Sequence, residues 1–151
     1  MMVNLEIINF KKDHAHIMVQ ALMNDPMTQV DEKFHDNLNG LEIPGMSFTA
    51  LKDDNIICSG GVIPVWDQVF EGWVMGSSLI WEHRIASAKA IKKGMEKLIK
   101  DNNIKRLQTA VKKDFYLGHK FAKWLGLEEE GLMKNYGPDG ADFYRFARII
   151  K

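Results

Sequence analysis

The sequence has little of three things that would each point to a particular class of protein: cysteine, an excess of one charge, and long apolar runs. Cys58 is the single cysteine, so no disulfide can form within the chain, and this usage fits a reducing compartment. Lysine plus arginine equals aspartate plus glutamate at 20 each, so no overall charge attracts nucleic acid or an anionic membrane. No run approaches the roughly 18 consecutive apolar residues of a membrane span.

The remaining composition is that of a soluble globular protein. The length of 151 residues predicts one domain, over 1–151, that is large enough to bury a real core. Apolar residues make up 46% of it, an ordinary share. The first residues, "MMVNLEIINF", carry Glu6 and no long apolar stretch. They are therefore not expected to be a signal peptide, and a cytoplasmic location is expected. Cys58 lies in the apolar run "NIICSGGVI" and is expected to be a buried thiol rather than a nucleophile.

The first half of the chain predicts a strand, a helix and an antiparallel meander. Alternation indicates a strand over 3–10, and helical spacing follows over 11–25, with Asp13 as the expected cap. The polar segment 26–45 is expected to hold a short helix and a mobile loop. Two strands are predicted over 47–66, around the turn Asp53-Asp54-Asn55, and a third over 69–81.

In the second half the hydrophobic period changes. A helix with one buried face is indicated by apolar residues three and four apart, namely Ala88, Ile91, Met95, Leu98 and Ile99. A strand over 105–113 and a helix over 114–126 follow, the helix with Asp114 as cap and Gly126 as its end. A terminal hairpin is predicted around "GPDG". The strand over 105–113 should lie parallel to the strand over 69–81 and splay from it at one end.

That order of elements, together with the stretches "EGWVMGSSLIWEHRIASAKAIKKGM", "AVKKDFYLGHKFAKWLGLEEEG" and "GPDGADFY", resembles the GNAT superfamily of N-acetyltransferases. The similarity covers about Leu51 to Ile150. More narrowly, the chain resembles divergent GNAT-like proteins of short-tailed phages, of the internal virion protein type. The resemblance implies an α/β (α+β) fold: a mixed, mostly antiparallel sheet of six to seven strands with helices on both faces.

The resemblance also implies an acetyl-CoA site at the junction between the third meander strand and the following helix. The pantetheine arm would lie along Gly76, Ser77, Ser78, Leu79 and Ile80. In the family, a loop of pattern Gln/Arg-x-x-Gly-x-Gly/Ala holds the pyrophosphate on backbone amides at a helix N-terminus. The residues implied for that role here are His83, Arg84, Ile85, Ala86, Ser87, Ala88 and Lys89.

This loop contains no glycine, so two registers of the family pattern are possible. Starting the family pattern at Arg84 puts Ser87 and Lys89 at the glycine positions, whereas starting at His83 puts Ala86 and Ala88 there. The second register is preferred, because small residues then lie where backbone must approach phosphate. Alanine disfavours the positive φ open to glycine, but a helical turn would still present its amides.

Glu71 and Tyr116 are the candidate catalytic residues that the resemblance implies. Glu71, early in the third meander strand, is near the position of the family's general base; the alternative is an exposed strand carboxylate. The tyrosine that usually protonates the leaving thiolate is replaced by Ala122, and Phe115 replaces a common asparagine contact. Tyr116, near the start of that helix, is the substitute acid. "GSS" over 76–78 is either a bulge where pantetheine approaches or a weak part of the strand.

The expected function is acyl-CoA-dependent N-acyl transfer, with acetyl-CoA as cosubstrate and an unidentified amine as acceptor. The rival hypothesis is a GNAT-like structural or interaction protein of a phage particle that has lost turnover, located in the virion. A homodimer or virion proteins are the protein partners considered, and no metal, nucleic-acid or membrane role is expected. The acceptor is not named by the sequence.

Overall fold

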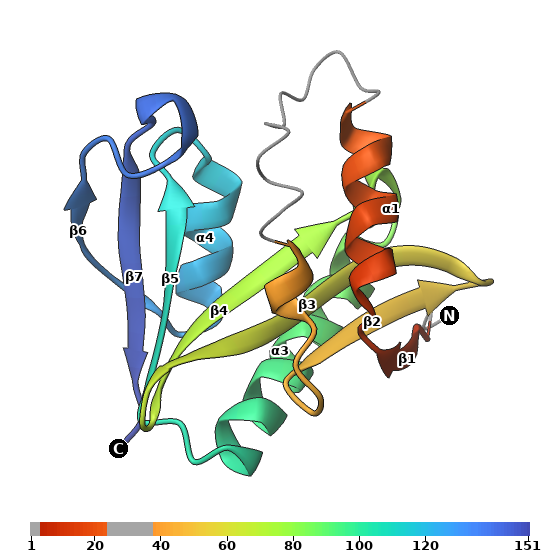
Figure 1. The fold of residues 1–151 in the computed structure, drawn as a ribbon, viewed down its shortest axis with the longest axis horizontal. Coiled ribbons are helices and arrows are strands. Elements are labelled where there is room, and N and C mark those ends of the chain that lie inside the picture. The colour runs from red at the N-terminus through yellow and green to blue at the C-terminus, as the bar shows by residue number, and fades with distance from the viewer. Residues whose placement is uncertain (1–3, 24–37) are drawn as a thin grey trace. The chain divides into compact units, whose positions relative to one another are not determined.

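Seven strands form a mixed sheet in the order β1-β2-β3-β4-β5-β7-β6, in a computed structural model that describes residues 4–23 and 38–151 (Figure 1). The strands are β1 (Glu6–Asn9), β2 (Ser47–Lys52), β3 (Asn55–Trp66), β4 (Val69–Gly76), β5 (Arg106–Lys112), β6 (Glu128–Met133) and β7 (Phe143–Ile149). The α-helices are α1 (Lys12–Met23), α3 (Arg84–Asp101) and α4 (Tyr116–Trp124), and the 3-10 helices are η1 (Leu38–Leu41), η2 (Ser78–Ile80) and η3 (Pro138–Gly140).

The pairing directions confirm the predicted mixed sheet. β1 with β2, β2 with β3, β5 with β7 and β6 with β7 pair antiparallel. β4 and β5 pair parallel, from Val69 opposite Arg106 to Glu71 opposite Gln108. The parallel pairing expected for these strands is therefore confirmed, whereas their splaying at one end stays a prediction.

The chain divides into two units, Met1–Ile63 with Trp73–Leu98, and Pro64–Gly72 with Ile99–Lys151. β4 contributes its first residues to the second unit and its last residues to the first. Whether the two form the single domain expected over 1–151 stays a prediction, and each unit is described by itself below.

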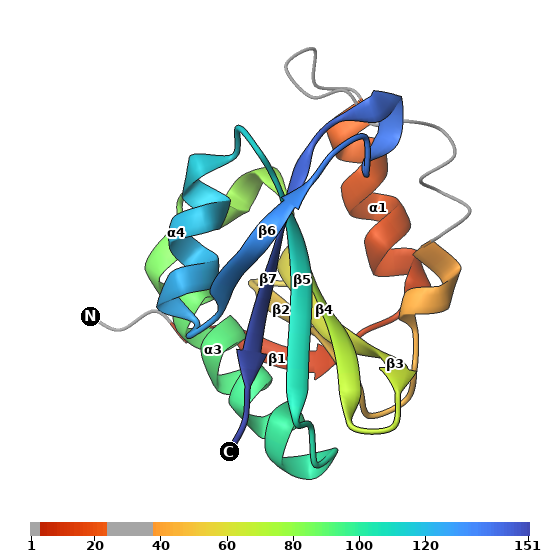
Figure 2. The same ribbon diagram turned by 90° about the vertical axis from the view of Figure 1, so that its left-hand side faces the viewer.

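In the first unit, helices cover both faces of the strands, as predicted (Figure 2). The Phe48 ring of β2 lies against α3, where a Cβ added at Gly94 would come within 2.6 Å of it. The neighbouring Thr49 points to the other face and contacts His14 of α1 at 2.8 Å. The missing side chain at Gly94 leaves room for the Phe48 ring. This contact offsets the cost of about 1 kcal/mol that glycine inside a helix carries relative to alanine.

In the second unit, α4 covers one face of β5 and β7 (Figure 2). Gly118 lets the helix approach Val111, which a Cβ there would meet at 2.9 Å. The His119 ring makes edge contacts with Tyr144 and Phe146 of β7, each at 5.4 Å between centroids. The α4-facing side of these strands therefore carries Val111, Tyr144 and Phe146, and the other side is not covered by α4.

The ends of several elements differ from those predicted from the sequence. Asp13 is not a cap but lies in the first turn of α1, which begins at Lys12. Asp114 does not cap α4, because Phe115 occupies the N-cap position without a side-chain cap bond. The first strand begins only at Glu6, and its Ile7 side chain is 53% exposed. The third meander strand ends at Gly76 instead of at 81.

Other predicted features of these elements are confirmed. Gly126 ends α4 with φ +91, and Leu127 N–H donates to the Ala122 carbonyl at 3.0 Å, the hydrogen bond of a Schellman end. The short helix expected within 26–45 is η1 (Leu38–Leu41). The expected mobile loop falls largely on 24–37, outside the described residues.

His14 joins the start of α1 to the buried side of β2. Its Nδ1 accepts from the Lys11 amide at 3.0 Å and from the Thr49 hydroxyl at 2.8 Å. Thr49 in turn bonds the Ser59 hydroxyl at 2.8 Å, and both hydroxyl residues are fully buried. Two donors on one ring nitrogen require a neutral imidazole there, and burial lowers the pKa of His14 from its ordinary 6.5.

Neutral His14 should therefore stabilise the fold in a pH-dependent way. Because the pKa is lower in the folded state than in the unfolded chain, this contribution is complete above about pH 6.5 and is lost as the pH falls below it. We expect His14→Gln, which keeps an acceptor but does not titrate, to flatten the decrease in the free energy of unfolding between about pH 7 and pH 5. Urea unfolding at each pH measures this, with His16→Gln as a control on the same helix. Equal pH dependence in wild type and His14→Gln would contradict the assignment.

Candidate functional site

The chain turns sharply at the end of β4, and the turn is built by Gly76 and Ser77. The Ser77 hydroxyl donates to the Ile56 carbonyl at 2.7 Å and accepts from the Leu79 amide at 3.2 Å, which caps η2. A Cβ at Gly76 would come within 2.8 Å of the Ile80 side chain, which folds back over the end of the strand. The small residues of "GSS" are therefore explained by a turn.

This turn corrects the conformation expected for the stretch that the resemblance implies for pantetheine. Residues 76–80 were expected to continue the strand, with Gly76 at a bulge or in a weak region. In the structure the strand stops at Gly76, and Ser78, Leu79 and Ile80 form the 3-10 turn η2. Ser78 is exposed, and Leu79 and Ile80 are half-buried. A ligand could therefore pair with the backbone of this stretch in the manner of a strand only as far as Gly76.

α3 begins directly after the turn, with His83 in the N-cap position. The His83 carbonyl accepts from the Ser87 amide at 2.8 Å, which closes the first turn of the helix. The amides of Arg84, Ile85 and Ala86 have no acceptor among the described residues, as the geometry of a first helical turn requires. The first turn carries no acidic residue. Within 83–89, all of it described, no residue has a positive φ.

The side chains around this helix start differ in what they can reach. Arg84 is exposed and donates to the Trp81 carbonyl at 3.3 Å. Ile85 is 67% exposed, Lys89 is exposed and Ala88 half-buried. The structure therefore leaves Arg84 and Lys89 as the accessible cations of the segment 83–89.

Ser87 points into the core of the first unit and not toward solvent. It is 1% exposed, and its hydroxyl has no nitrogen or oxygen partner among the described residues. It faces the Cys58 thiol, whose pKa is raised to about 11 by burial, against a smaller lowering by Ser87. Cys58 is therefore the buried, protonated thiol that the sequence indicated.

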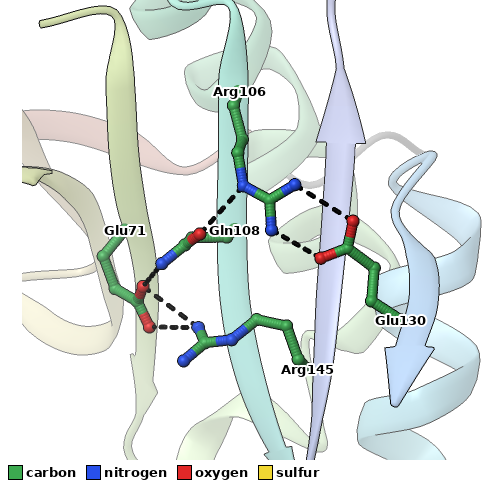
Figure 3. Close-up of polar contacts among 5 residues, drawn as sticks. All are labelled: Glu71, Arg106, Gln108, Glu130 and Arg145. Atoms are coloured by element: carbon green, nitrogen blue, oxygen red, sulfur yellow. Dashed lines mark hydrogen bonds and ion pairs between the residues drawn. The ribbon is translucent and has the colours of Figure 1, made fainter. Parts of the chain in front are cut away.

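A second group of polar residues lies in the second unit, on the strand face that α4 does not cover (Figure 3). Glu71 of β4 accepts from Arg145 Nη1 at 3.0 and 3.1 Å, one bond to each carboxylate oxygen. Gln108 of β5 donates to Glu71 Oε2 at 2.9 Å. The Glu71 side chain is 28% exposed and that of Arg145 19%, so this is a partly buried ion pair.

Arg106 and Glu130 extend this group toward β6 (Figure 3). Arg106 donates through Nε to Gln108 Oε1 at 2.9 Å and through both terminal nitrogens to the Glu130 carboxylate. That hydrogen bonding lowers the pKa of Glu130 and raises the pKa of Arg106. Because Glu130 is 41% exposed, the pair is screened by solvent and contributes little to stability.

Glu71 and Tyr116, the two candidate catalytic residues, lie on opposite faces of the strands in the second unit. Glu71 contacts Gln108 on the face away from α4, whereas Tyr116 is the first residue of α4 and is 72% exposed. Ala122, at the position of the family's tyrosine, is 4% exposed and has no polar group. The two candidates make no contact with each other among the described residues.

Sequence reasoning found Glu71 but missed the four residues grouped with it: Arg106, Gln108, Glu130 and Arg145. The available signal was alternation. In "RLQ" the polar Arg106 and Gln108 flank the buried Leu107, so they must share a face of an inner strand. Which residues of β4, β6 and β7 meet them depends on the register of four strands, which alternation does not supply.

The two sites differ in the chemistry they support. The start of α3 offers amides and cations to an anion, and the Glu71 group offers a carboxylate that can accept a proton. Among residues 4–23 and 38–151, no group of histidine, cysteine, aspartate or glutamate residues is arranged to hold a metal ion. Within the same residues, no helix is long and apolar enough to cross a membrane.

Comparison of sequences finds no protein-family model and no curated protein that matches the chain. Solved structures do match. Ribosomal-protein-alanine N-acetyltransferase from Brucella melitensis superposes with a TM-score of 0.73 at 17% identity, covering 97% of this chain and 100% of that one. Ard1 from Thermoplasma volcanium superposes with a TM-score of 0.79 at 13% identity, covering 99% of both chains.

A third match is an acetyltransferase of the GNAT family from Streptococcus pneumoniae, with a TM-score of 0.71 and 14% identity over 98% of this chain and 100% of that one. At such identities a structural match shows the fold and not the activity. The seven-stranded order, the parallel β4–β5 pair and these superpositions together show that the chain has the fold of the GNAT acetyltransferases.

Proposed function

We propose that the protein is an acyl-CoA-dependent N-acyltransferase that transfers acetyl from acetyl-CoA to an amine. The observation that carries this proposal is the first turn of α3, where the amides of Arg84, Ile85 and Ala86 are uncommitted among the described residues. Helix N-termini of this kind favour phosphate through their N–H groups and the helix dipole. The fold supports the proposal, because the matching structures are acetyltransferases.

In this proposal the CoA pyrophosphate binds over His83–Lys89, with amides of the first turn, Arg84 and Lys89 as its partners. No positive φ is needed, because an ordinary helical turn presents the amides. Ser87 has a different part. Its side chain is buried and its amide is bonded to His83, so it shapes the turn instead of contacting phosphate. The pantetheine arm meets the end of β4 at Gly76 and the turn that follows.

The reaction is direct attack of an amine on the thioester. The amine nitrogen bonds to the acetyl carbon, the carbon–sulfur bond breaks, Glu71 takes the proton lost by the amine, and the thiolate takes a proton as it leaves. Glu71 is held in position by its contacts with Arg145 and Gln108. As a general base it should contribute on the order of 10²–10⁴-fold. Tyr116 is the candidate source of the thiolate's proton, and because it lies on the strand face opposite Glu71, this role requires the thiolate to leave toward the start of α4.

The rival hypothesis is a non-catalytic GNAT-like protein, such as a structural protein of a phage particle. Buried Ala122 in place of the family's tyrosine favours it, since no hydroxyl is present at that position. The two hypotheses differ in what happens after CoA binding, so binding and turnover have to be measured separately.

CoA binding tests the proposed anion site at the start of α3. Replacing Arg84 and Lys89 together by alanine should weaken acetyl-CoA binding by roughly tenfold or more, because charge-assisted contacts to phosphate contribute about 1.5–3 kcal/mol each. Calorimetric titration measures this. The matched control replaces Lys93 and Lys100, which are also exposed on α3, and should change binding little. Equal losses in both double variants, or no binding by the wild type at millimolar acetyl-CoA, would contradict the site.

Turnover tests the roles proposed for Glu71 and Tyr116. Glu71→Gln should remove most thiol release from acetyl-CoA on a broad panel of amines and leave acetyl-CoA affinity nearly unchanged. Tyr116→Phe should cause a smaller loss, because a thiolate needs less help to leave. Glu129→Gln, an exposed carboxylate on β6, is the control and should retain full release.

The other outcomes distinguish loss of turnover from a wrong assignment of the base. CoA binding without thiol release on any amine would favour the non-catalytic hypothesis. Release that is unchanged in Glu71→Gln would keep the acyltransferase and remove Glu71 as its base.

A further inference from the structure

The two arginines of the polar group in the second unit differ in how fully their donors are used. Arg106 is saturated: Nε bonds Gln108, and both terminal nitrogens bond Glu130. Arg145 uses only Nη1, which bonds both oxygens of Glu71. Its Nε and Nη2 have no acceptor among the described residues, although the side chain is only 19% exposed. A partly buried guanidinium with one uncommitted edge is equipped to bind an anion.

The shape of that edge restricts the anion. Nε–H and one N–H of Nη2 point in parallel from the same side of the guanidinium plane, and this fork matches the two oxygens of a carboxylate. Figure 3 shows the second terminal nitrogen of Arg145 pointing away from Arg106 and Glu130. The Tyr136 ring lies 5.7 Å from the guanidinium carbon. It therefore holds the fork from one face by a cation–π contact.

We infer that the free edge of Arg145 binds a carboxylate of the acceptor, so that the acceptor is an amine of the amino-acid class. The inference rests on the proposed function, in which Glu71 receives the proton of the acceptor amine. Glu71 and Arg145 are bonded to each other, so an amino group at the first and a carboxylate at the second must be only a few bonds apart. The paired charges of Glu71 and Arg145 complement those of a zwitterion in which ammonium faces Glu71 and carboxylate faces Arg145.

Binding of acceptor analogues tests this without relying on turnover. Calorimetry would compare N-acetyl amino acids as free acids with their matched primary amides, across the standard side chains, with and without CoA. In the wild type, at least one free acid should bind roughly tenfold or more tightly than its amide, because only the acid supplies a charged bidentate acceptor to the fork.

Variants then show whether Arg145 is responsible. Arg145→Gln should reduce the acid-to-amide preference to about one, and Arg145→Lys should lose most of it, because lysine keeps the charge without the fork. Arg148→Gln, which changes an arginine of β7 that donates to the Leu125 carbonyl at the end of α4, should keep the preference. Thermal unfolding of each variant confirms that it is folded before its binding is compared.

A preference for the acid that survives both Arg145 substitutions would overturn the inference. So would the absence of any acid preference in the wild type, with or without CoA. Failure of the proposed function is seen separately, in thiol release. A protein that prefers acids through Arg145 but releases no thiol keeps the carboxylate site and loses the acyltransferase role.

Discussion

The first turn of α3 leaves backbone amides that the helix itself cannot satisfy, and the proposed chemistry of the first unit depends on them. β4 ends at Gly76, Ser77 caps the short turn that follows, and α3 begins at Arg84. No acidic side chain occupies its first turn. The segment has no glycine between 77 and 93, and it needs none, because a regular helical turn already directs its N–H groups outward.

The second unit is organised by a different constraint, the pairing of charges on a half-buried strand face. Glu71 and Glu130 are each bonded by an arginine, and Gln108 links the two pairs. A carboxylate held in this way is fixed in position. The arrangement therefore favours orientation of an acceptor amine, which suits an amine that attacks a thioester with a good leaving group.

Much of the fold follows from the spacing of hydrophobic residues along the chain, but the grouping of polar side chains around Glu71 does not. The change from alternation to helical spacing identified α3, and the parallel β4–β5 pair followed from the order of elements. The errors arose where a single residue determines where a helix begins. Asp13 and Asp114 look like caps, yet helices begin at Lys12 and Tyr116. Arg145 was missed because its partner, Glu71, is brought to it by strand register and not by spacing along the chain.

The most direct test of the central claim is to observe the backbone amides of α3 during titration with acetyl-CoA, by amide chemical shifts in an ¹⁵N-labelled protein. If the first turn holds the pyrophosphate, the amides of Arg84, Ile85 and Ala86 should show the largest shifts, and the same shifts should appear with CoA lacking the acetyl group. Saturable binding of acetyl-CoA that leaves these three amides unperturbed would contradict the account.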